Sequence, residues 1–261
     1  MSWAFDIMAA FAICLVSLGL WRLTVTVSDG AVLALLPLAV VVFLGVFRPL
    51  LAARQASLRV VLRPGGRLAG IVTGRFGALG GALLFTLVAV PVLAFTAIRA
   101  DRTEGLALVL LFVTSCALSV GIRAWLGRSI TDSHSRLWGH RIAAVVAGTL
   151  FSAVLFWLHW AVISRPGAVA GQGFAESLQA AILELPPRSA WLRVVLEPFA
   201  VIEAAKLWLA TAMHGTFRAG MVYSLDAALV GFVVARCAVA ALDFTESIRA
   251  AVSWRAANDR R

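Results

Sequence analysis

Apolar runs about as long as a membrane is thick place the strongest constraint on the fold of this chain. A helix needs roughly 20 mostly apolar residues to cross the hydrocarbon core, and such runs recur along the sequence. Of the 261 residues, 61% are hydrophobic and 14% are charged, whereas soluble domains have about 45–50% and about 25%. The runs do not alternate apolar and polar residues, as the strands of transmembrane barrels do. The sequence therefore predicts an all-α, polytopic transmembrane helix bundle, with residues 1–261 forming a single integral membrane domain.

Six runs are long enough to be predicted as spanning helices. They cover about residues 3–25, 31–51, 76–98, 106–122, 141–163 and 217–242. Residues 174–185 have helical periodicity but are too few to span, which is typical of an amphipathic helix at the membrane interface. The segment 190–214 is ambiguous, and it decides between six and seven spans.

The arginines predict how the bundle is oriented. They gather in the loops at 48–75 and 123–141 and in the segment after residue 242, which also favours an even number of crossings. The positive-inside rule places these segments and the N-terminus in the cytoplasm. Anionic lipid headgroups are the expected partners of the arginine-rich loops, and nucleic acid is not expected. All basic residues but one are arginine, which is typical of a GC-rich genome, and we expect a bacterial inner-membrane protein.

The segment 190–214 carries charges that oppose crossing. Between residues 194 and 213, eight Leu, Ile, Phe or Val residues contribute about −2 to −5 kcal/mol to insertion. Glu197, Glu203 and Lys206 each oppose it by about 2.5–3.5 kcal/mol near the bilayer centre, and Pro198 removes a helix hydrogen bond. The segment therefore cannot cross while it faces lipid. It spans within the bundle, re-enters the membrane, or lies at the interface.

Three ionisable residues of this segment form a narrow polar stripe. At 100° per residue, Glu203, Lys206 and His214 fall within about 80° of one another. Glu203 and Lys206, the only lysine of the chain, are spaced so that they can pair. Ionisable groups inside a membrane are rare and mark functional sites, so the three are candidates for a transport path. The alternative is a self-neutralised pair on an interfacial helix.

Two further candidates lie in the last predicted span. Asp226 and Arg236 are about 15 Å apart along a helix axis and cannot pair with each other. Asp226 therefore needs another partner, for which we expect Lys206, whereas the long side chain of Arg236 can reach an interface. Both are candidates for the transport path. The alternative for Asp226 is a structural charge pair that holds two helices together.

Five glycines spaced by four and three residues lead into the third predicted span. They are Gly66, Gly70, Gly74, Gly77 and Gly81. On one helix all five fall within about 80°, and such a face lets another backbone approach closely. We predict a helix-packing face that serves tight packing, self-association or a hinge. A flexible glycine-rich loop is the alternative.

No catalytic or metal-binding pattern accompanies these candidates. The chain has no Walker A motif, no GxSxG, no HExxH and no CxxC spacing, so the sequence predicts no cofactor and no metal and does not favour an enzyme. The predicted function is that of a transporter, permease or channel component, alone or as one subunit of a larger complex. The alternative is a non-catalytic scaffold or assembly subunit. Either function involves self-association or other membrane subunits.

Overall fold

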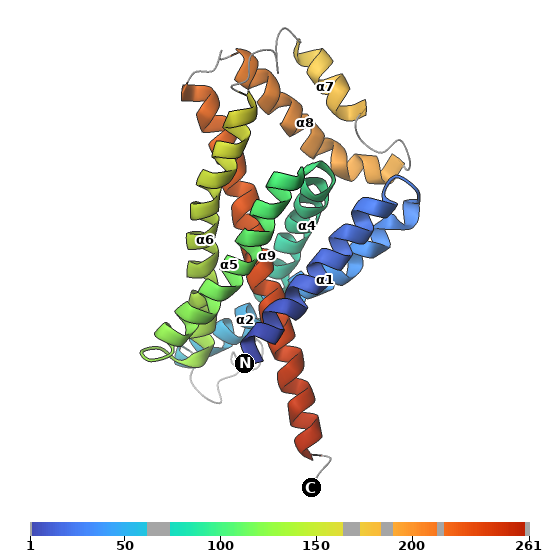
Figure 1. Cartoon of the computed structure of the whole chain (residues 1–261). Coiled ribbons are helices and arrows are strands. Elements are labelled where there is room, and N and C mark those ends of the chain that lie inside the picture. The colour runs from blue at the N-terminus through green and yellow to red at the C-terminus, as the bar shows by residue number, and fades with distance from the viewer. Residues whose placement is uncertain (1, 62–73, 164–172, 184–189, 213–216, 259–261) are drawn as a thin grey trace.

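The computed structural model describes residues 2–61, 74–163, 173–183, 190–212 and 217–258, and every element in these ranges is a helix. Figure 1 shows them as a bundle with two further helices across one end. In chain order they are α1 (Ser2–Thr24), the 3-10 helix η1 (Asp29–Leu35), α2 (Leu36–Val61), α4 (Arg75–Arg99), α5 (Arg102–Leu126), α6 (Asp132–Ile163), α7 (Phe174–Leu183), α8 (Ala190–Ala212) and α9 (Phe217–Asn258).

Six stretches within the described ranges are long and apolar enough to cross a membrane. They are Trp3–Thr24, Gly30–Leu58, Arg75–Arg99, Arg102–Leu126, His134–Leu158 and Ala227–Arg255. Each overlaps one of the predicted spans, and the prediction of an all-α, polytopic transmembrane bundle is confirmed. The chain is an integral membrane protein.

Several helices continue well beyond the apolar runs that predicted them. α9 has 42 residues, which makes it about 63 Å long, against a hydrocarbon core of about 30 Å. The arginine-bearing segment after residue 242 is the continuation of this helix, and the last turns of the helix project from the bundle in Figure 1. α2 likewise ends ten residues later than predicted, at Val61, and α6 begins nine residues earlier, at Asp132. Arginine is a good helix former but is costly to place in hydrocarbon. An apolar run therefore marks only the part of a helix that lies in the hydrocarbon core, and arginine-bearing turns extend the helix beyond it.

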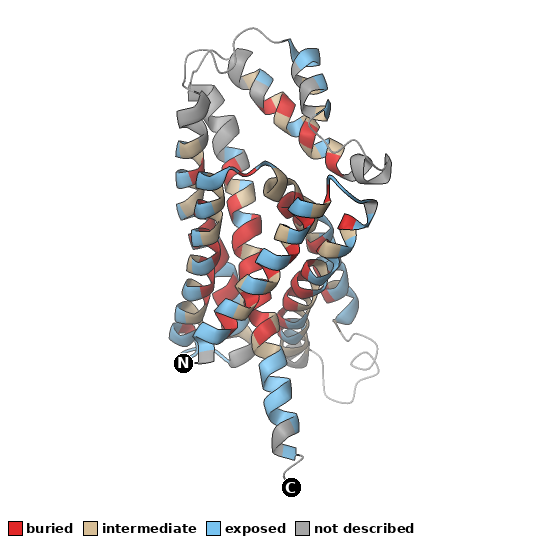
Figure 2. Cartoon of the chain, turned by 45° about the vertical axis from the view of Figure 1, so that its right-hand side comes forward, coloured by how far each residue is buried: buried red, intermediate tan, exposed pale blue. Residues whose placement is uncertain are grey.

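α9 is the central helix, and it packs against α1, α2, α4, α5 and α6. Figure 2 shows the buried residues concentrated along its middle. Alanine is the most frequent residue at its buried positions, which include Ala235, Ala238 and Ala241, each fully buried. Small residues at a helix interface let backbones approach closely, which is how membrane helices gain packing contacts.

Glycines provide the closest approaches to α9. A Cβ added at Gly45 of α2 would overlap the backbone carbonyl of Ala240, and one added at Gly148 of α6 would lie 3.1 Å from the Phe232 backbone. Gly231 of α9 faces Gly148 in return. These contacts with α2 and α6 fix where α9 sits in the bundle, because any side chain at Gly45 would push backbones apart.

α7 and α8 lie across one end of the bundle, α7 beside α8 and α8 oblique to the long helices (Figure 1). The helix expected at 174–185 is present over Phe174–Leu183, and residues 184–185 lie outside the described ranges. α8 contacts α7, α4 and α9. It is not among the six stretches that meet the length and composition of a span.

Both ends of the chain in Figure 1 lie at the other end of the bundle, together with the turn between α5 and α6. The last turns of α2 and the first turns of α6 also lie there. This end therefore collects the arginine-rich segments of the sequence, and we refer to it as the arginine-rich end.

Candidate functional site

The candidates on α8 are only partly described. Lys206 Nζ lies 2.5 Å from Glu203 Oε2, and the lysine side chain is 7% exposed, so the expected pairing is present. His214 lies outside the described residues. The backbone of Asp226 belongs to α9, but its side chain lies outside the described part of the chain, as does the expected contact with Lys206.

Arg236 lies inside the bundle. Its guanidinium is 5.6 Å from the centre of the Phe85 ring on α4, a cation–π contact that favours a cation in a low-dielectric setting. It also lines a small cavity between α2, α6 and α9. The side chain thus faces other helices, where the sequence had predicted that it could reach an interface.

Three of the five candidate glycines are described, and they do not form one continuous helical face. Gly74 precedes α4 with φ 69°, a left-handed conformation that ends any helical register through it. A Cβ at Gly77 would overlap the guanidinium of Arg54 on α2, and one at Gly81 would make an ordinary contact with Leu50. These glycines therefore border α2, while Gly66 and Gly70 lie outside the described residues.

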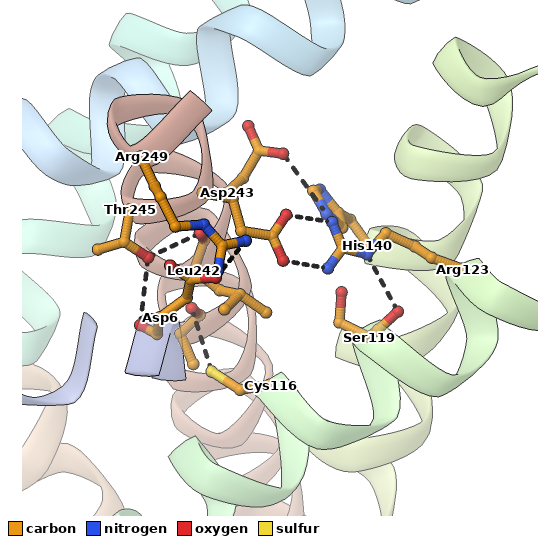
Figure 3. Close-up of polar contacts among 11 residues, drawn as sticks. Asp6, Cys116, Ser119, Arg123, His140, Leu242, Asp243, Thr245 and Arg249 are labelled. Atoms are coloured by element: carbon orange, nitrogen blue, oxygen red, sulfur yellow. Dashed lines mark hydrogen bonds and ion pairs between the residues drawn. The ribbon is translucent and has the colours of Figure 1, made fainter. Parts of the chain in front are cut away.

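The structure brings together a different set of ionisable groups, at the arginine-rich end (Figure 3). Three helices meet around the buried half of α9: α1 brings Asp6, α5 brings Arg123 and α6 brings His140, while α9 itself brings Asp243 and Glu246. Ionisable groups within spanning helices face the bundle interior and pair with one another because lipid cannot solvate them. We call this set, with Arg249, the ionic network.

Successive side chains of α9 face different partners because they are about 100° apart around the helix. Glu246 accepts two hydrogen bonds from the Arg123 guanidinium, both at 2.6 Å, so this pair is bidentate. Arg249 Nη2 lies 2.8 Å from Asp6 Oδ2. Thr245 Oγ1 lies 2.9 Å from the Leu242 carbonyl of its own helix and 3.2 Å from the Asp6 backbone carbonyl, and its single proton is shared between these two acceptors. α9 is thereby tied to α5 and α1 at the same level.

The contact of α9 with α6 is of another kind. His140 Nε2 lies 3.8 Å from Asp243 Oδ1, and these side chains are 7% and 3% exposed. That distance is too long for a hydrogen bond, and neither atom has another hydrogen-bond partner among the described residues. The buried hydroxyl of Ser119 on α5 also has none. Leaving a buried polar atom without a hydrogen bond costs about 1–3 kcal/mol of stability. The His140–Asp243 pair bears this cost, whereas the neighbouring Arg123–Glu246 pair, with two hydrogen bonds, does not.

A small cavity of about 20 Å³ adjoins His140 and Arg236. A water molecule needs about 10–15 Å³ of such space and two or more polar partners, so the cavity can hold one. Arg236 and Asp243 are seven residues apart on α9, which places them about 20° apart around the axis and about 10 Å apart along it. His140 therefore lies beside a face of α9 that carries both the guanidinium of Arg236 and the carboxylate of Asp243.

A second, larger pocket opens at the same end of the bundle. It has about 490 Å³ and lies between α2 and α6, with Arg54 and Arg141 in its lining. Leu50 and Leu137 line both this pocket and the small cavity. The small cavity beside His140 and the larger pocket therefore adjoin at these two side chains.

Sequence reasoning missed most of the ionic network. Asp243, Glu246 and Arg249 counted only toward the charge of the segment after the last predicted span, and His140 was one of four scattered histidines. Two signals could have found it. Asp6 is a carboxylate inside the first apolar run, which demands a partner, and Asp243, Glu246 and Arg249 recur every three residues.

The described residues contain no group of three or more His, Cys, Asp and Glu side chains placed to hold a metal ion. The three cysteines are free, buried and on different helices, with Cys116 Sγ donating to the Ala238 carbonyl at 3.5 Å. No family model, curated protein or solved structure matches this chain.

Proposed function

We propose that this protein is a membrane transporter, permease or channel component in which a proton moves past the His140–Asp243 pair. One observation carries the proposal: a histidine and an aspartate, both buried among spanning helices, face each other without a hydrogen bond. Intramembrane histidines and carboxylates form the proton relays of pumps and transporters. A pair with a purely structural role would be more stable at hydrogen-bond distance, which is where Arg123 and Glu246 lie.

The surroundings of the pair suit this role. An imidazole can take up a proton at one nitrogen and release it from the other, and a water-sized cavity lies beside His140. Leu50 and Leu137 line both that cavity and the larger open pocket, so the open pocket offers water a route toward His140. We propose that Glu203, Lys206 and Asp226, toward the other end of α9, serve the opposite end of the same path.

Proton flux into liposomes tests the proposal. Purified protein is reconstituted with the pH-sensitive dye pyranine inside the vesicles, and a potassium gradient with valinomycin imposes an inside-negative potential. We expect faster internal acidification than in protein-free vesicles, and near-background rates for His140→Gln and for Asp243→Asn. Asp101→Asn is the matched control, because this exposed carboxylate caps α5 outside the network and asparagine caps equally well.

The outcome that contradicts the proposal is also clear. If the wild-type protein carries no proton current under a potential of either sign, or if both variants retain the wild-type rate, the pair has no role in proton movement. Circular dichroism and a monodisperse elution profile establish beforehand that each variant is folded.

The scaffold alternative has its own supporting observation. The part of α9 that projects from the bundle (Figure 1) carries exposed apolar side chains at Ile248, Val252 and Trp254. Ile248 and Val252 are four residues apart and share one face, which suits contact with another chain. A scaffold predicts an oligomer in detergent, measured by light scattering, that Ile248→Glu with Val252→Glu dissociates, and no proton flux from the wild-type protein.

We also propose that the arginine-rich end faces the cytoplasm of a bacterial inner membrane. The gathering of arginine-rich segments at one end of the bundle supports this through the positive-inside rule. The native cysteines are buried, so introduced cysteines can be labelled selectively with a membrane-impermeant maleimide. In intact spheroplasts we expect labelling of Ser28→Cys and none of Ser129→Cys until the membrane is opened. The reverse pattern contradicts the orientation.

A further inference from the structure

The pocket between α2 and α6 is lined by two matching helix faces. α2 contributes Arg54, Ser57 and Leu58, at positions i, i+3 and i+4, and α6 contributes His134, Trp138 and Arg141, at positions i, i+4 and i+7. Residues with these spacings share one face of a helix. With about 490 Å³, the pocket falls within the usual size range of small-molecule sites, about 300–1,000 Å³. We call it the basic pocket.

The charge of the basic pocket is of one sign. Its described ionisable lining residues are Arg54, Arg141 and His134, and none of the described lining residues is a carboxylate. Neither arginine forms an ion pair with an acidic residue in the part of the chain that the structure describes, whereas Arg123 and Arg249 of the same end both do. Two guanidinium groups that line one pocket, without a described acidic partner, repel each other, and an anion between them removes that repulsion.

Both guanidinium groups are held in place by contacts with their neighbours. The Arg141 guanidinium lies 5.7 Å from the centre of the Trp138 ring, a cation–π contact that restricts its orientation. The Arg54 guanidinium occupies the space that a side chain at Gly77 would fill. Binding an anion would therefore order these side chains less than it would two free arginines, and the entropic cost of binding is smaller.

The chemistry of the basic pocket points to a phosphate group. A guanidinium presents parallel N–H donors that match a phosphate in bidentate fashion. The pocket also has apolar walls, Leu50 and Leu137 among them, and basic pockets between spanning helices on the cytoplasmic side take anionic lipid headgroups. A phosphorylated solute would present the same group.

We propose that the basic pocket binds a phosphate-bearing anion, held between Arg54 and Arg141. The proposal does not rest on the proton path proposed above, because neither arginine belongs to the ionic network, although Leu50 and Leu137 line both the basic pocket and the cavity beside His140. It differs from general attraction of lipids to a basic surface in that two named side chains account for the affinity.

Two variants and a matched control test the site. Arg54→Gln with Arg141→Gln removes both guanidinium groups, and Gly77→Ala keeps every charge but displaces the Arg54 guanidinium. Arg128→Gln with Arg255→Gln is the control: it removes the same charge from exposed positions at the same end, outside the basic pocket. Native mass spectrometry of the delipidated protein in detergent then measures binding of dihexanoyl phosphatidylglycerol.

We expect one tightly bound phosphatidylglycerol, with affinity falling about tenfold or more in the arginine double variant because two charge-assisted contacts are lost. Gly77→Ala weakens binding less, and the control leaves it within about twofold, as expected for screened surface charges. The proposal is overturned if the double variant binds as tightly as the wild type, or if the control weakens binding equally. If the arginine double variant does not fold, Gly77→Ala alone tests the site. An unchanged affinity for phosphatidylglycerol in that variant would then refute it.

Competition identifies the source of the phosphate group. Inorganic phosphate and glycerol 3-phosphate are added at increasing concentration against bound phosphatidylglycerol, with dihexanoyl phosphatidylcholine as the zwitterionic lipid. If only phosphatidylglycerol binds, the pocket holds an anionic lipid headgroup. If the soluble phosphates displace it at comparable concentrations, the pocket holds a phosphorylated solute. Both results support the site, and absence of binding by all three anions refutes it.

Discussion

Breaking the Arg123–Glu246 pair should destabilise the bundle more than any other single loss of charge in the ionic network. The two side chains are 13% and 17% exposed and share two hydrogen bonds of 2.6 Å. Removing one partner of a buried pair leaves an uncompensated charge and costs about 3–5 kcal/mol. Because this pair retains some exposure, we expect about 3 kcal/mol for Arg123→Met, and as much for Glu246→Leu.

The double variant distinguishes a coupled pair from two independent side chains. With both charges gone no buried charge remains, and apolar replacement of a buried pair is often close to neutral. We therefore expect the double variant to lose far less stability than the two single losses combined, with a coupling energy of at least about 2 kcal/mol. Methionine keeps the unbranched stem of the arginine, so that packing is disturbed little.

Unfolding by dodecyl sulphate in mixed micelles, followed by far-ultraviolet circular dichroism, measures these losses. Each variant is compared with the wild type by its midpoint and by its extrapolated free energy of unfolding. If both single variants cost less than about 1 kcal/mol, the pair has the strength of an exposed surface pair. If the losses simply add, the two residues do not act together, and the reasoning from burial fails.

The same unfolding assay checks three further predictions. Arg249→Gln should cost only about 1 kcal/mol, and the loss should shrink at high salt, because this arginine is 42% exposed where it meets Asp6. Gly45→Ala should lower the unfolding midpoint strongly because a Cβ there overlaps the α9 backbone, whereas Gly80→Ala, with open space around it, should leave the midpoint unchanged or raise it. Gly139→Ala should cost less than Gly45→Ala but more than Gly80→Ala, because its Cβ meets the side-chain stem of the paired arginine on α5 rather than backbone.

The membrane-crossing part of the fold could be predicted from the sequence because the hydrocarbon core imposes its own length on apolar runs. All six predicted spans overlap helices that meet this criterion. The ends of the helices could not be predicted in the same way. Beyond the core, water and headgroups solvate arginines, so α9 continues from residue 242 to Asn258 with no apolar signal to mark it.

The candidate site was harder to predict because its partners are far apart in sequence. Glu203 and Lys206 were paired correctly from their spacing on one helix, since three residues bring side chains together locally. Arg123 and Glu246 are separated by 123 residues, and Thr245 and Asp6 by 239. Only the packing of α1, α5 and α6 around α9 brings such residues into contact, and no local pattern specifies that packing.

The central position of α9 has a consequence for how the protein is made. The two ion pairs of the network and the His140–Asp243 pair each have one member on α9, and α9 leaves the ribosome after α1, α5 and α6. Until it arrives, Asp6, Arg123 and His140 reside in membrane-inserted helices without these partners, at a cost in free energy. α9 therefore acts as the closing element of co-translational assembly. A nascent bundle without it exposes charge to lipid, which is the feature by which membrane quality control can distinguish an unfinished chain from a finished one.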